Sequence, residues 1–145
     1  MPKQTMFESK ITVHTDGGSR GNPGPAAIGV VIGGKEYGEY AGVKTNNQAE
    51  YMAVRFALKK MKQMLGKKKT KETEVDFKID SELVVKQLNG QYKILEPELQ
   101  PLFLEIWNAR LDFKKVVFEH VVRAENRAAD ALVNKILDRE ARSWR

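Results

Sequence analysis

Four acidic residues occupy short, distinctive motifs and are the residues of this chain best suited to chemistry. Asp16 opens a stretch rich in glycine and proline, and Glu50 closes the motif TNNQAE. Asp80 ends a run of alternating polar and apolar residues, and Asp130 closes the motif NRAAD. If the fold gathers these carboxylates, they require divalent cations, because like charges at close range repel strongly. Cations held in this way favour chemistry on phosphate.

Each carboxylate also has an ordinary structural explanation. An acidic residue near a helix N-terminus is favoured by the helix dipole alone, and an Asp-Ser pair after a strand often begins a helix. The stretch 17–25 is by itself typical of a turn, and it lacks the Lys-Ser/Thr ending of a phosphate-binding P-loop. The functional argument therefore depends on the combination of motifs.

Hydrophobic periodicity predicts the strands and helices that must position the carboxylates. We expect strands over 11–16, 26–32, 35–43, 74–80 and 115–122. We expect helices over 47–65, 81–88, 97–107 and 126–137. The order β-β-β-α-β-α-α-β-α implies a mixed sheet covered by helices. Asp16 and Asp80 then lie at or near strand ends, and Glu50 and Asp130 lie near helix N-termini, where open α/β sheets place their sites.

The ends of the predicted helices follow from capping and turn residues. Asn46 or Asn47 is expected to cap the first helix, which places Glu50 in its first turn. Gly66 should end that helix and leave the lysines of 67–71 in a solvated loop. Pro97 suits the first turn of the third helix, and Asn126 should cap the last one.

Composition restricts the class of protein. The 145 residues fit one domain, and the absence of cysteine excludes disulfides, thiolate zinc sites and cysteine nucleophiles. The sequence shows no signal peptide and no apolar run near the about 18 residues of a membrane span. We therefore expect a soluble, cytoplasmic monomer with no membrane association and no obligate protein partner. The net charge of +6 and the pI near 9.5 favour a polyanionic partner.

The four carboxylates predict a particular metal chemistry. Carboxylate oxygens are hard ligands that suit Mg²⁺ or Mn²⁺. Two such ions, about 3.5–4 Å apart, can activate a water and stabilise the leaving oxygen of a phosphodiester. Asn46 and Asn47 offer amide groups for the edges of a nucleic-acid groove or for a 2′-hydroxyl, although capping is the simpler explanation for one of them.

These motifs together resemble those of type 1 ribonuclease H. The motifs TDGGS, GNPGP, TNNQAE, DS and NRAAD fall in the order and spacing of that family, over roughly residues 10 to 140. Each motif alone is weak, but five in order are specific. The resemblance implies an α/β protein with the ribonuclease H-like fold, in which a five-stranded mixed sheet has helices on both faces. It implies a single domain over residues 1–145, with a core over about 10–140 and flexible termini.

The resemblance also implies an activity and the residues that perform it. The expected enzyme is an endonuclease that cuts the RNA strand of an RNA–DNA hybrid and leaves 5′-phosphate and 3′-hydroxyl ends. Asp16, Glu50, Asp80 and Asp130 correspond to the catalytic carboxylates, which hold two Mg²⁺ or Mn²⁺ ions when substrate is bound. The substrate-binding positions correspond to Gly17, Gly18, Asn22, Thr45, Asn46, Asn47 and Ser81, with Thr45 at a phosphate of the DNA strand. Arg123 and Asn126 are auxiliary candidates.

The chain departs from the family pattern in two places. Many bacterial members carry a histidine in a mobile loop before the last aspartate; the apolar neighbours of His120 instead predict a strand, which leaves Arg123 as the nearest cation. Some members insert a basic helix and loop that grips substrate, but the segment 91–97 is short and weakly charged. The lysines of 59–71 either replace that grip in part or form a solvated helix end.

Two other classes of function remain compatible with such a fold. One is a nucleic-acid-binding module without catalytic activity, which has no need to keep all four carboxylates. The other is an integrase or a Holliday-junction nuclease, against which the motif 45–50 and the short chain argue.

Overall fold

The computed structural model describes residues 9–143, and residues 1–8 and 144–145 lie outside the description. The expectation of flexible termini therefore concerns, in part, residues that are not described. The described residues form five strands and four α-helices with one short 3-10 helix, η1. Their bounds are β1 Ser9–Ser19, β2 Gly24–Ile32, β3 Lys35–Lys44, α2 Asn46–Lys71, β4 Thr73–Ile79, α3 Glu82–Leu88, α4 Gln100–Arg110, β5 Lys115–His120, η1 Arg123–Asn126 and α5 Arg127–Ser143.

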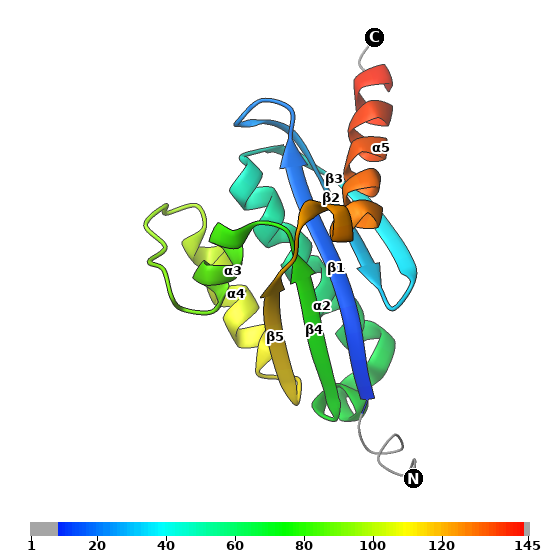
Figure 1. The fold of residues 1–145 in the computed structure, drawn as a ribbon, viewed down its shortest axis with the longest axis vertical. Helices are drawn as coiled ribbons and strands as arrows, with labels where there is room; N and C mark the ends of the chain where they lie inside the picture. Colours follow the sequence, from blue (N-terminus) through cyan, green and yellow to red (C-terminus); the bar gives the residue numbers. More distant parts are fainter. Residues whose placement is uncertain (1–8, 144–145) are drawn as a thin grey trace.

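The five strands form one mixed sheet in the order β3-β2-β1-β4-β5 (Figure 1). β1, β2 and β3 pair in antiparallel fashion, because the tight turn at Gly33-Gly34 and the short link after β1 return the chain beside itself. β4 and β5 pair in parallel with their neighbours, because helices connect them. This arrangement confirms the predicted fold class and order of elements.

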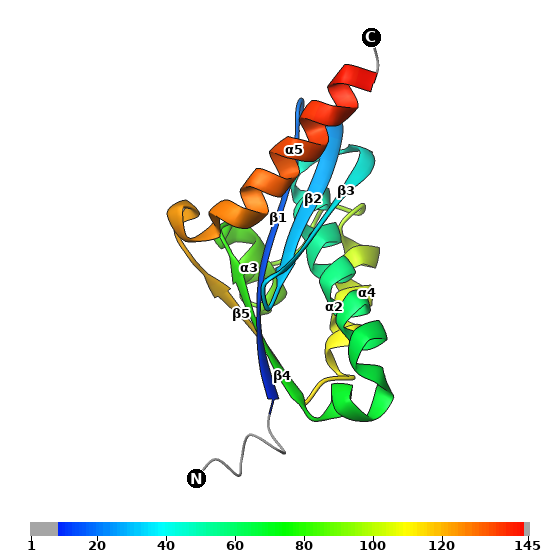
Figure 2. The ribbon, with the colours of Figure 1, turned by 90° about the vertical axis from the view of Figure 1, so that its right-hand side faces the viewer.

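Helices cover both faces of the sheet (Figure 2). α5 packs against β2 and β3 on one face, and α2 packs against β1 and β2 on the other, with α4 beside α2. The larger core cluster lies under α2 and includes Tyr51, Leu58, Phe77 and Ile79, each fully buried. A smaller cluster joins α5 to Ala27 of β2. Within residues 9–143, no helix has both the length and the apolar character that a membrane crossing requires.

The start of α2 differs from the prediction that an asparagine caps it. Thr45 is the N-cap: its Oγ1 accepts the Gln48 N–H at 3.1 Å, and the Gln48 side chain accepts the Thr45 N–H at 2.9 Å. This reciprocal capping box satisfies two N–H groups that otherwise lack partners. Because the helix begins at Asn46, Glu50 is its fifth residue and lies just beyond the first turn, one or two residues later than predicted.

Three other helix ends also differ from the predictions. Gly66 interrupts α2 with φ +80°, as its type suggests, but the lysines after it form a further helical turn rather than a loop. The proline in the first turn of α4 is Pro101, whereas Pro97 lies in the preceding turn. The chain also forms η1 before α5, so Asn126 does not cap that helix. By contrast, Ser81 caps α3 as predicted, accepting the Val84 N–H at 3.3 Å.

Candidate active site

The sheet brings Asp16 and Asp80 to adjacent positions. The parallel pairing of β1 with β4 ends at Thr15 opposite Ile79, so the next residues of both strands are the two aspartates. Asp80 follows β4 as predicted. Asp16 lies inside β1 rather than at its end, because β1 continues to pair with β2 as far as Ser19.

Gly17 allows α2 to deliver Glu50 beside this pair. A Cβ atom at Gly17 would lie 2.2 Å from the carbonyl carbon of Ala49 and 2.5 Å from the Glu50 nitrogen. Only a glycine therefore permits the backbone of α2 to approach β1 this closely. The resulting cluster is tight, since one carboxylate oxygen from each of Asp16, Glu50 and Asp80 lies within 4.8 Å of the others.

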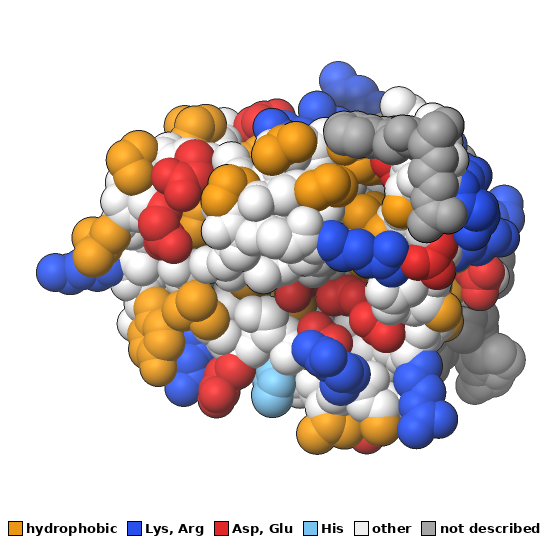
Figure 3. Space-filling view, turned by 90° about the horizontal axis from the view of Figure 1, so that it is seen from above, with side chains coloured by type: hydrophobic (Ala, Val, Ile, Leu, Met, Phe, Trp, Pro, Cys, Tyr) orange, Lys and Arg blue, Asp and Glu red, His pale blue; other side chains and the backbone are white. Residues whose placement is uncertain are grey.

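α5 supplies Asp130 to the same place. Gly29 of β2 permits this, because a Cβ there would lie 2.2 Å from the Ala129 carbonyl oxygen. Asp130 lies close enough to Asp16 to share a proton with it, which helps to raise the pKa of Asp16. All four predicted carboxylates line one cleft of about 440 Å³. Seen from above, acidic side chains gather beside this hollow and basic side chains flank them (Figure 3).

Burial and the crowding of carboxylates raise two pKa values. Burial is the largest cause for Asp16, and the charges of Asp80 and Asp130 add to it, so the pKa of Asp16 rises from 3.8 to about 8. Burial followed by the charges of Asp16 and Asp80 raises the pKa of Glu50 well above its ordinary value. A hydrogen bond from the Gly17 backbone lowers both pKa values in part. Without cations, the cluster therefore holds protons near neutral pH.

The raised pKa of Asp16 predicts a pH-dependent stability in the presence of EDTA. Between about pH 3.8 and pH 8 the unfolded chain releases a proton that the folded protein keeps, so the free energy of unfolding decreases as the pH rises through this window. The contribution of protonated Asp16 to the free energy of unfolding is fully present below pH 3.8 and is lost by about pH 8. Asp16→Asn should be increasingly more stable than the wild type as the pH rises from 4 to 8, as measured by urea denaturation. A constant difference across this range would contradict the assignment.

The donor set fits divalent cations with a preference for oxygen ligands. Asp16, Glu50 and Asp80 offer carboxylate oxygens, which suit Mg²⁺ or Mn²⁺. The buried Oε1 of Glu50 has no hydrogen-bond partner, although a buried polar atom normally has one. A cation bound by these side chains would satisfy that oxygen and would offset the burial and the repulsion that together raise the two pKa values.

The structure distinguishes Arg123 from His120, the two residues that the sequence suggested as a cation near the carboxylates. Arg123 lies at the cleft, with its Nε 3.9 Å from Oδ2 of Asp80, and its side chain is 83% exposed. Its charge lowers the pKa of Glu50. His120 is an exposed residue at the end of β5, which confirms the prediction of a strand histidine. Of the two, Arg123 is the residue that the fold places at the carboxylates.

Several polar groups predicted to contact substrate hold the rim of the cleft together. Oδ1 of Asn22 accepts the Asn46 N–H at 2.9 Å, and Oδ1 of Asn46 accepts the Ser19 N–H at 2.9 Å. Both amides therefore use their oxygens inside the protein and retain their NH₂ donors for a ligand. Asn46, Asn47, Ser81, Gly17 and Gly18 line the cleft, whereas Asn22 and Thr45 are not among its lining residues.

Comparisons with known proteins agree with this arrangement. A family model described as "Reverse transcriptase-like" matches residues 14–136. The structure of LC11-RNase H1 in complex with an RNA/DNA hybrid superposes with a TM-score of 0.84 and 43% sequence identity, covering 90% of this chain and 99% of that one. The chain belongs to the type 1 ribonuclease H family. Family membership confirms the resemblance seen in the motifs.

Two curated ribonuclease H relatives are longer than this chain. Ribonuclease HI of Halobacterium salinarum is 38% identical over 135 residues, which are 89% of this chain and 65% of that protein. A bifunctional protein of Mycobacterium tuberculosis is 35% identical over 141 residues, which are 92% of this chain and 37% of that protein. The chain thus spans between about a third and two thirds of the length of these two family members.

Asn126 has a role in this ribonuclease H domain that the motif did not reveal. Instead of capping α5, its side chain is buried: Nδ2 donates to the Thr15 carbonyl at 2.8 Å, and Oδ1 lies 3.1 Å from Nδ1 of His14. These bonds attach the start of α5 to β1, directly beside Asp16. They therefore help to fix the position of Asp130.

Replacing Asn126 with alanine should lower the free energy of unfolding by about 1–3 kcal/mol, because the buried Thr15 carbonyl loses its donor. Urea denaturation measures the loss. Asn134→Ala is the control, since this asparagine is exposed and, among residues 9–143, its side chain bonds within α5 and to Arg20. Equal stability of the two variants would show that the buried bonds contribute little.

Sequence reasoning missed further residues of the cleft. Arg20 lines it and is held by Asp138 of α5, with Nη2 2.6 Å from Oδ1. Val133, Asn134 and Leu137 supply the wall on the α5 side. Arg20 lies inside the predicted glycine-rich motif, so its position was a usable signal. The three α5 residues carry no such signal, because only the packing of α5 brings them to the cleft.

Proposed function

We propose that this chain hydrolyses the RNA strand of RNA–DNA hybrids as an endonuclease, leaving 5′-phosphate and 3′-hydroxyl ends. The observation that supports it most is the cluster of Asp16, Glu50 and Asp80, drawn from three separate elements to within 4.8 Å and containing an unpartnered buried oxygen. A fold does not maintain such repulsion unless the site has a use for it. The hybrid in the LC11-RNase H1 complex supports the choice of substrate.

The four carboxylates are the proposed catalytic and metal-binding residues. Asp16, Glu50 and Asp80 hold Mg²⁺ or Mn²⁺, and Asp130 completes the set through its contact with Asp16. Two ions bound there supply an activated water and stabilisation of the leaving oxygen. The protein's own contribution is to keep the carboxylates rigid: β1 and β4 fix Asp16 and Asp80, and the contact at Gly17 fixes Glu50.

The rim of the cleft is the proposed substrate-binding surface. The NH₂ groups of Asn46 and Asn47 can donate to 2′-hydroxyls, which distinguish RNA from DNA. Gly17 and Gly18 let the backbone approach the ligand closely. Asn22, Thr45 and Ser81 hold their neighbours in place through the hydrogen bonds of their side chains, and the hydroxyl protons of Thr45 and Ser81 are still available to a phosphate.

Cleavage of a labelled RNA–DNA hybrid tests the proposal directly. The hybrid is incubated with Mg²⁺, with Mn²⁺ or with EDTA, beside double-stranded RNA and double-stranded DNA of the same sequence. We expect cutting of the RNA strand with at least one metal and none with EDTA. End-group analysis should find 5′-phosphates and 3′-hydroxyls. An uncut hybrid with both metals would contradict the proposed activity.

Arg123 is proposed to offset the charge of the carboxylates during turnover. Arg123→Ala should lower kcat by about 2–10-fold and leave KM nearly unchanged, because a side chain that is 83% exposed acts through a screened interaction. Steady-state cleavage of the hybrid measures both constants. Arg127→Ala is the matched control, since Arg127 is also exposed and does not line the cleft. Unchanged kcat in Arg123→Ala would exclude this role.

Three predictions about the whole protein remain part of the proposal. They are that residues 1–145 act as one catalytic domain, that the protein is monomeric, and that it is cytoplasmic. Size-exclusion chromatography with light scattering tests the second of these.

A further inference from the structure

The positive charge of this protein is concentrated on one helix. α2 contains eight lysine and arginine residues and a single acidic residue, so it carries +7, whereas the whole chain carries +6. The remainder of the protein is therefore close to neutral. A charge distribution of this kind is expected of a protein that binds a polyanion along α2. Charge that serves only solubility would be spread over the whole surface.

The C-terminal end of α2 presents four lysines without an ion-pair partner in the described part of the chain. The side chains of Lys67, Lys68, Lys69 and Lys71 form no ion pair within residues 9–143. The turn that carries them is firmly held, because Oγ1 of Thr70 donates to the Gly66 carbonyl at 2.6 Å, and Oγ1 of Thr73 donates to the Lys69 carbonyl at 2.7 Å. We call these four side chains the lysine patch.

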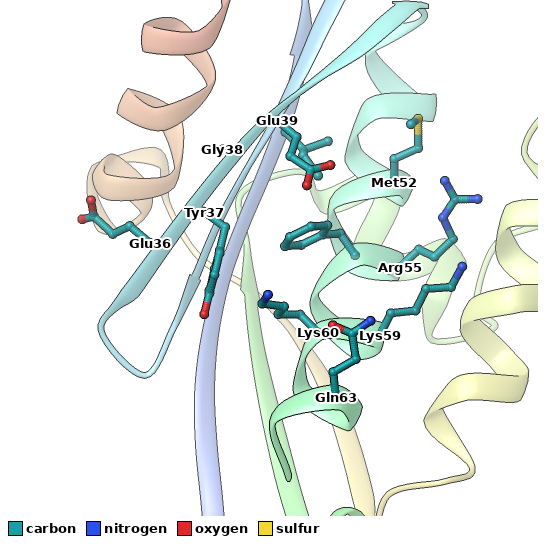
Figure 4. A pocket seen from close by; sticks show the side chains of 11 residues that line it. Glu36, Tyr37, Gly38, Glu39, Met52, Arg55, Lys59, Lys60 and Gln63 are labelled. Atoms are coloured by element: carbon teal, nitrogen blue, oxygen red, sulfur yellow. The ribbon is translucent and has the colours of Figure 1, made fainter. Parts of the chain in front are cut away.

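A groove lies along the middle of α2, between that helix and β3, with a volume of about 690 Å³ (Figure 4). Two aromatic side chains form part of it: the ring centroids of Tyr37 and Phe56 lie 5.9 Å apart, and Nζ of Lys60 lies 5.1 Å from the Tyr37 centroid. Arg55 and Lys59 stand on the same wall and share Glu105 of α4.

The groove combines cations with two half-buried aromatic rings. This combination suits single-stranded nucleic acid, whose phosphates contact lysine and arginine while its bases contact aromatic rings. Glu36 and Glu39 of β3 also line the groove and oppose a polyanion, but Arg55, Lys59 and Lys60 outnumber them there. The ion pairs to Glu105 are partly exposed, and such pairs cost only about 0–1 kcal/mol to rearrange.

α2 joins these features to the cleft. Asn46 and Asn47 at its start line the cleft, the groove follows its middle, and the lysine patch lies beyond the interruption at Gly66, after about 30 Å of helix from Asn46 to Leu65. A nucleic-acid duplex, with a persistence length of about 50 nm, is straight over this distance and cannot follow the change of direction at Gly66. A flexible single strand has no such restriction.

We propose that α2 guides a single-stranded extension of the substrate from the cleft, through the groove, to the lysine patch. The proposal rests on the proposed function in one respect, since it takes the nucleic acid in the cleft to be a hybrid. The extension adds affinity through phosphate contacts and does not take part in cleavage. Substrates with single-stranded flanks are therefore bound more tightly than blunt hybrids of the same duplex length.

Binding of blunt and extended hybrids tests this in EDTA, which prevents cleavage. A fluorescent hybrid is compared with the same hybrid carrying about 15 thymidines, a length within the usual range of such grooves, on each end of each strand in turn. For the wild type, at least one extension should lower Kd by about tenfold or more at low salt. Replacing all four lysines of the patch with glutamine should remove this gain while the Kd of the blunt hybrid stays the same.

A second set of measurements separates the patch from net charge. The slope of log Kd against log salt for the extended hybrid should fall by about 3 in the four-lysine variant, since each single-strand phosphate contact contributes about 0.7. Replacing Lys35, Lys135, Arg139 and Arg142 with glutamine removes the same charge from exposed positions elsewhere and should preserve the gain. Arg55→Gln with Lys60→Gln should reduce the gain in part, through the groove.

Three results would overturn the proposal: no extension tightens binding by the wild type, the four-lysine variant keeps the gain, or the control variant loses it equally. These outcomes are distinguishable from failure of the proposed function. Cleavage of the blunt hybrid with Mg²⁺ or Mn²⁺ tests the activity alone, whereas the effect of the extension is measured without metal and without cleavage.

Discussion

Asp80→Asn should abolish hybrid cleavage and leave the protein folded. The substitution keeps the shape of the side chain but removes a negative charge from the cluster of Asp16, Glu50 and Asp80. In this cluster, one carboxylate oxygen of each residue lies within 4.8 Å of the others. Loss of a metal ligand should cost more than the about 10–100-fold that loss of an outer-shell partner costs. We therefore expect kcat/KM to fall by at least about a hundredfold with Mg²⁺ or Mn²⁺. Steady-state cleavage of a labelled hybrid measures it.

The same substitution should not destabilise the fold. Asp80 is one of the charges that raise the pKa values of Asp16 and Glu50, so its removal relieves repulsion in the metal-free protein. Urea denaturation in EDTA should show equal or higher stability for Asp80→Asn. This combination of lost activity and retained stability is expected of a residue whose role is catalytic rather than structural.

Asp76→Asn provides a matched control on the same strand. Asp76 is also an aspartate of β4, but it pairs with Lys10 at 3.2 Å and lies outside the cleft. Its replacement should leave kcat/KM within about twofold of the wild type, since exposed ion pairs contribute little. If Asp80→Asn cut the hybrid as fast as Asp76→Asn, the proposed metal site would be in the wrong place.

The order of elements was predictable because each depends on local pattern. The strand of β4 alternates buried and partly exposed residues throughout, and the burial of β2 on both faces matches its unbroken apolar run. The sequence placed Asp16 and Asp80 at or near strand ends, and the pairing of β1 with β4 in the structure brings them together. The motifs then identified the other two carboxylates through the family resemblance.

The features that could not be predicted depend on tertiary contacts. Any of Thr45, Asn46 and Asn47 is a suitable cap, and the choice of Thr45 follows from the bonds of Asn46 to Ser19 and Asn22 across the rim. Asn126 has the residue type of a cap, but the approach of α5 to β1 buries it and gives it a different partner. In both cases local propensity offered several answers, and packing selected one.

The size of the pKa shifts could not be predicted from the sequence either. The motifs indicated that four carboxylates belong together, but the shift of Asp16 depends first on burial and only then on its neighbours. Burial of this carboxylate follows from α2 closing on β1 at Gly17 and α5 closing on β2 at Gly29. The glycines of the cleft are therefore as necessary to the site as its acids are.

Gly17→Ala should show most strongly that the site depends on its glycines. The added Cβ would lie 2.2 Å from the carbonyl carbon of Ala49 and 2.3 Å from its oxygen, so α2 must move away from β1. Overpacking against a rigid backbone costs about 3 kcal/mol or more when neither side can yield. Urea denaturation should show a loss of this size, and hybrid cleavage should fall because Glu50 moves with α2.

Gly18→Ala separates this steric effect from any general intolerance of the motif. A Cβ at Gly18 would lie 3.6 Å from Cγ1 of Val133, which is an ordinary van der Waals contact. Its backbone does not require glycine either, since its φ is not positive. Gly18→Ala should therefore remain within about 1 kcal/mol of the wild type in stability. If Gly17→Ala were equally stable, the close approach of α2 to β1 would not be what places Glu50 in the site.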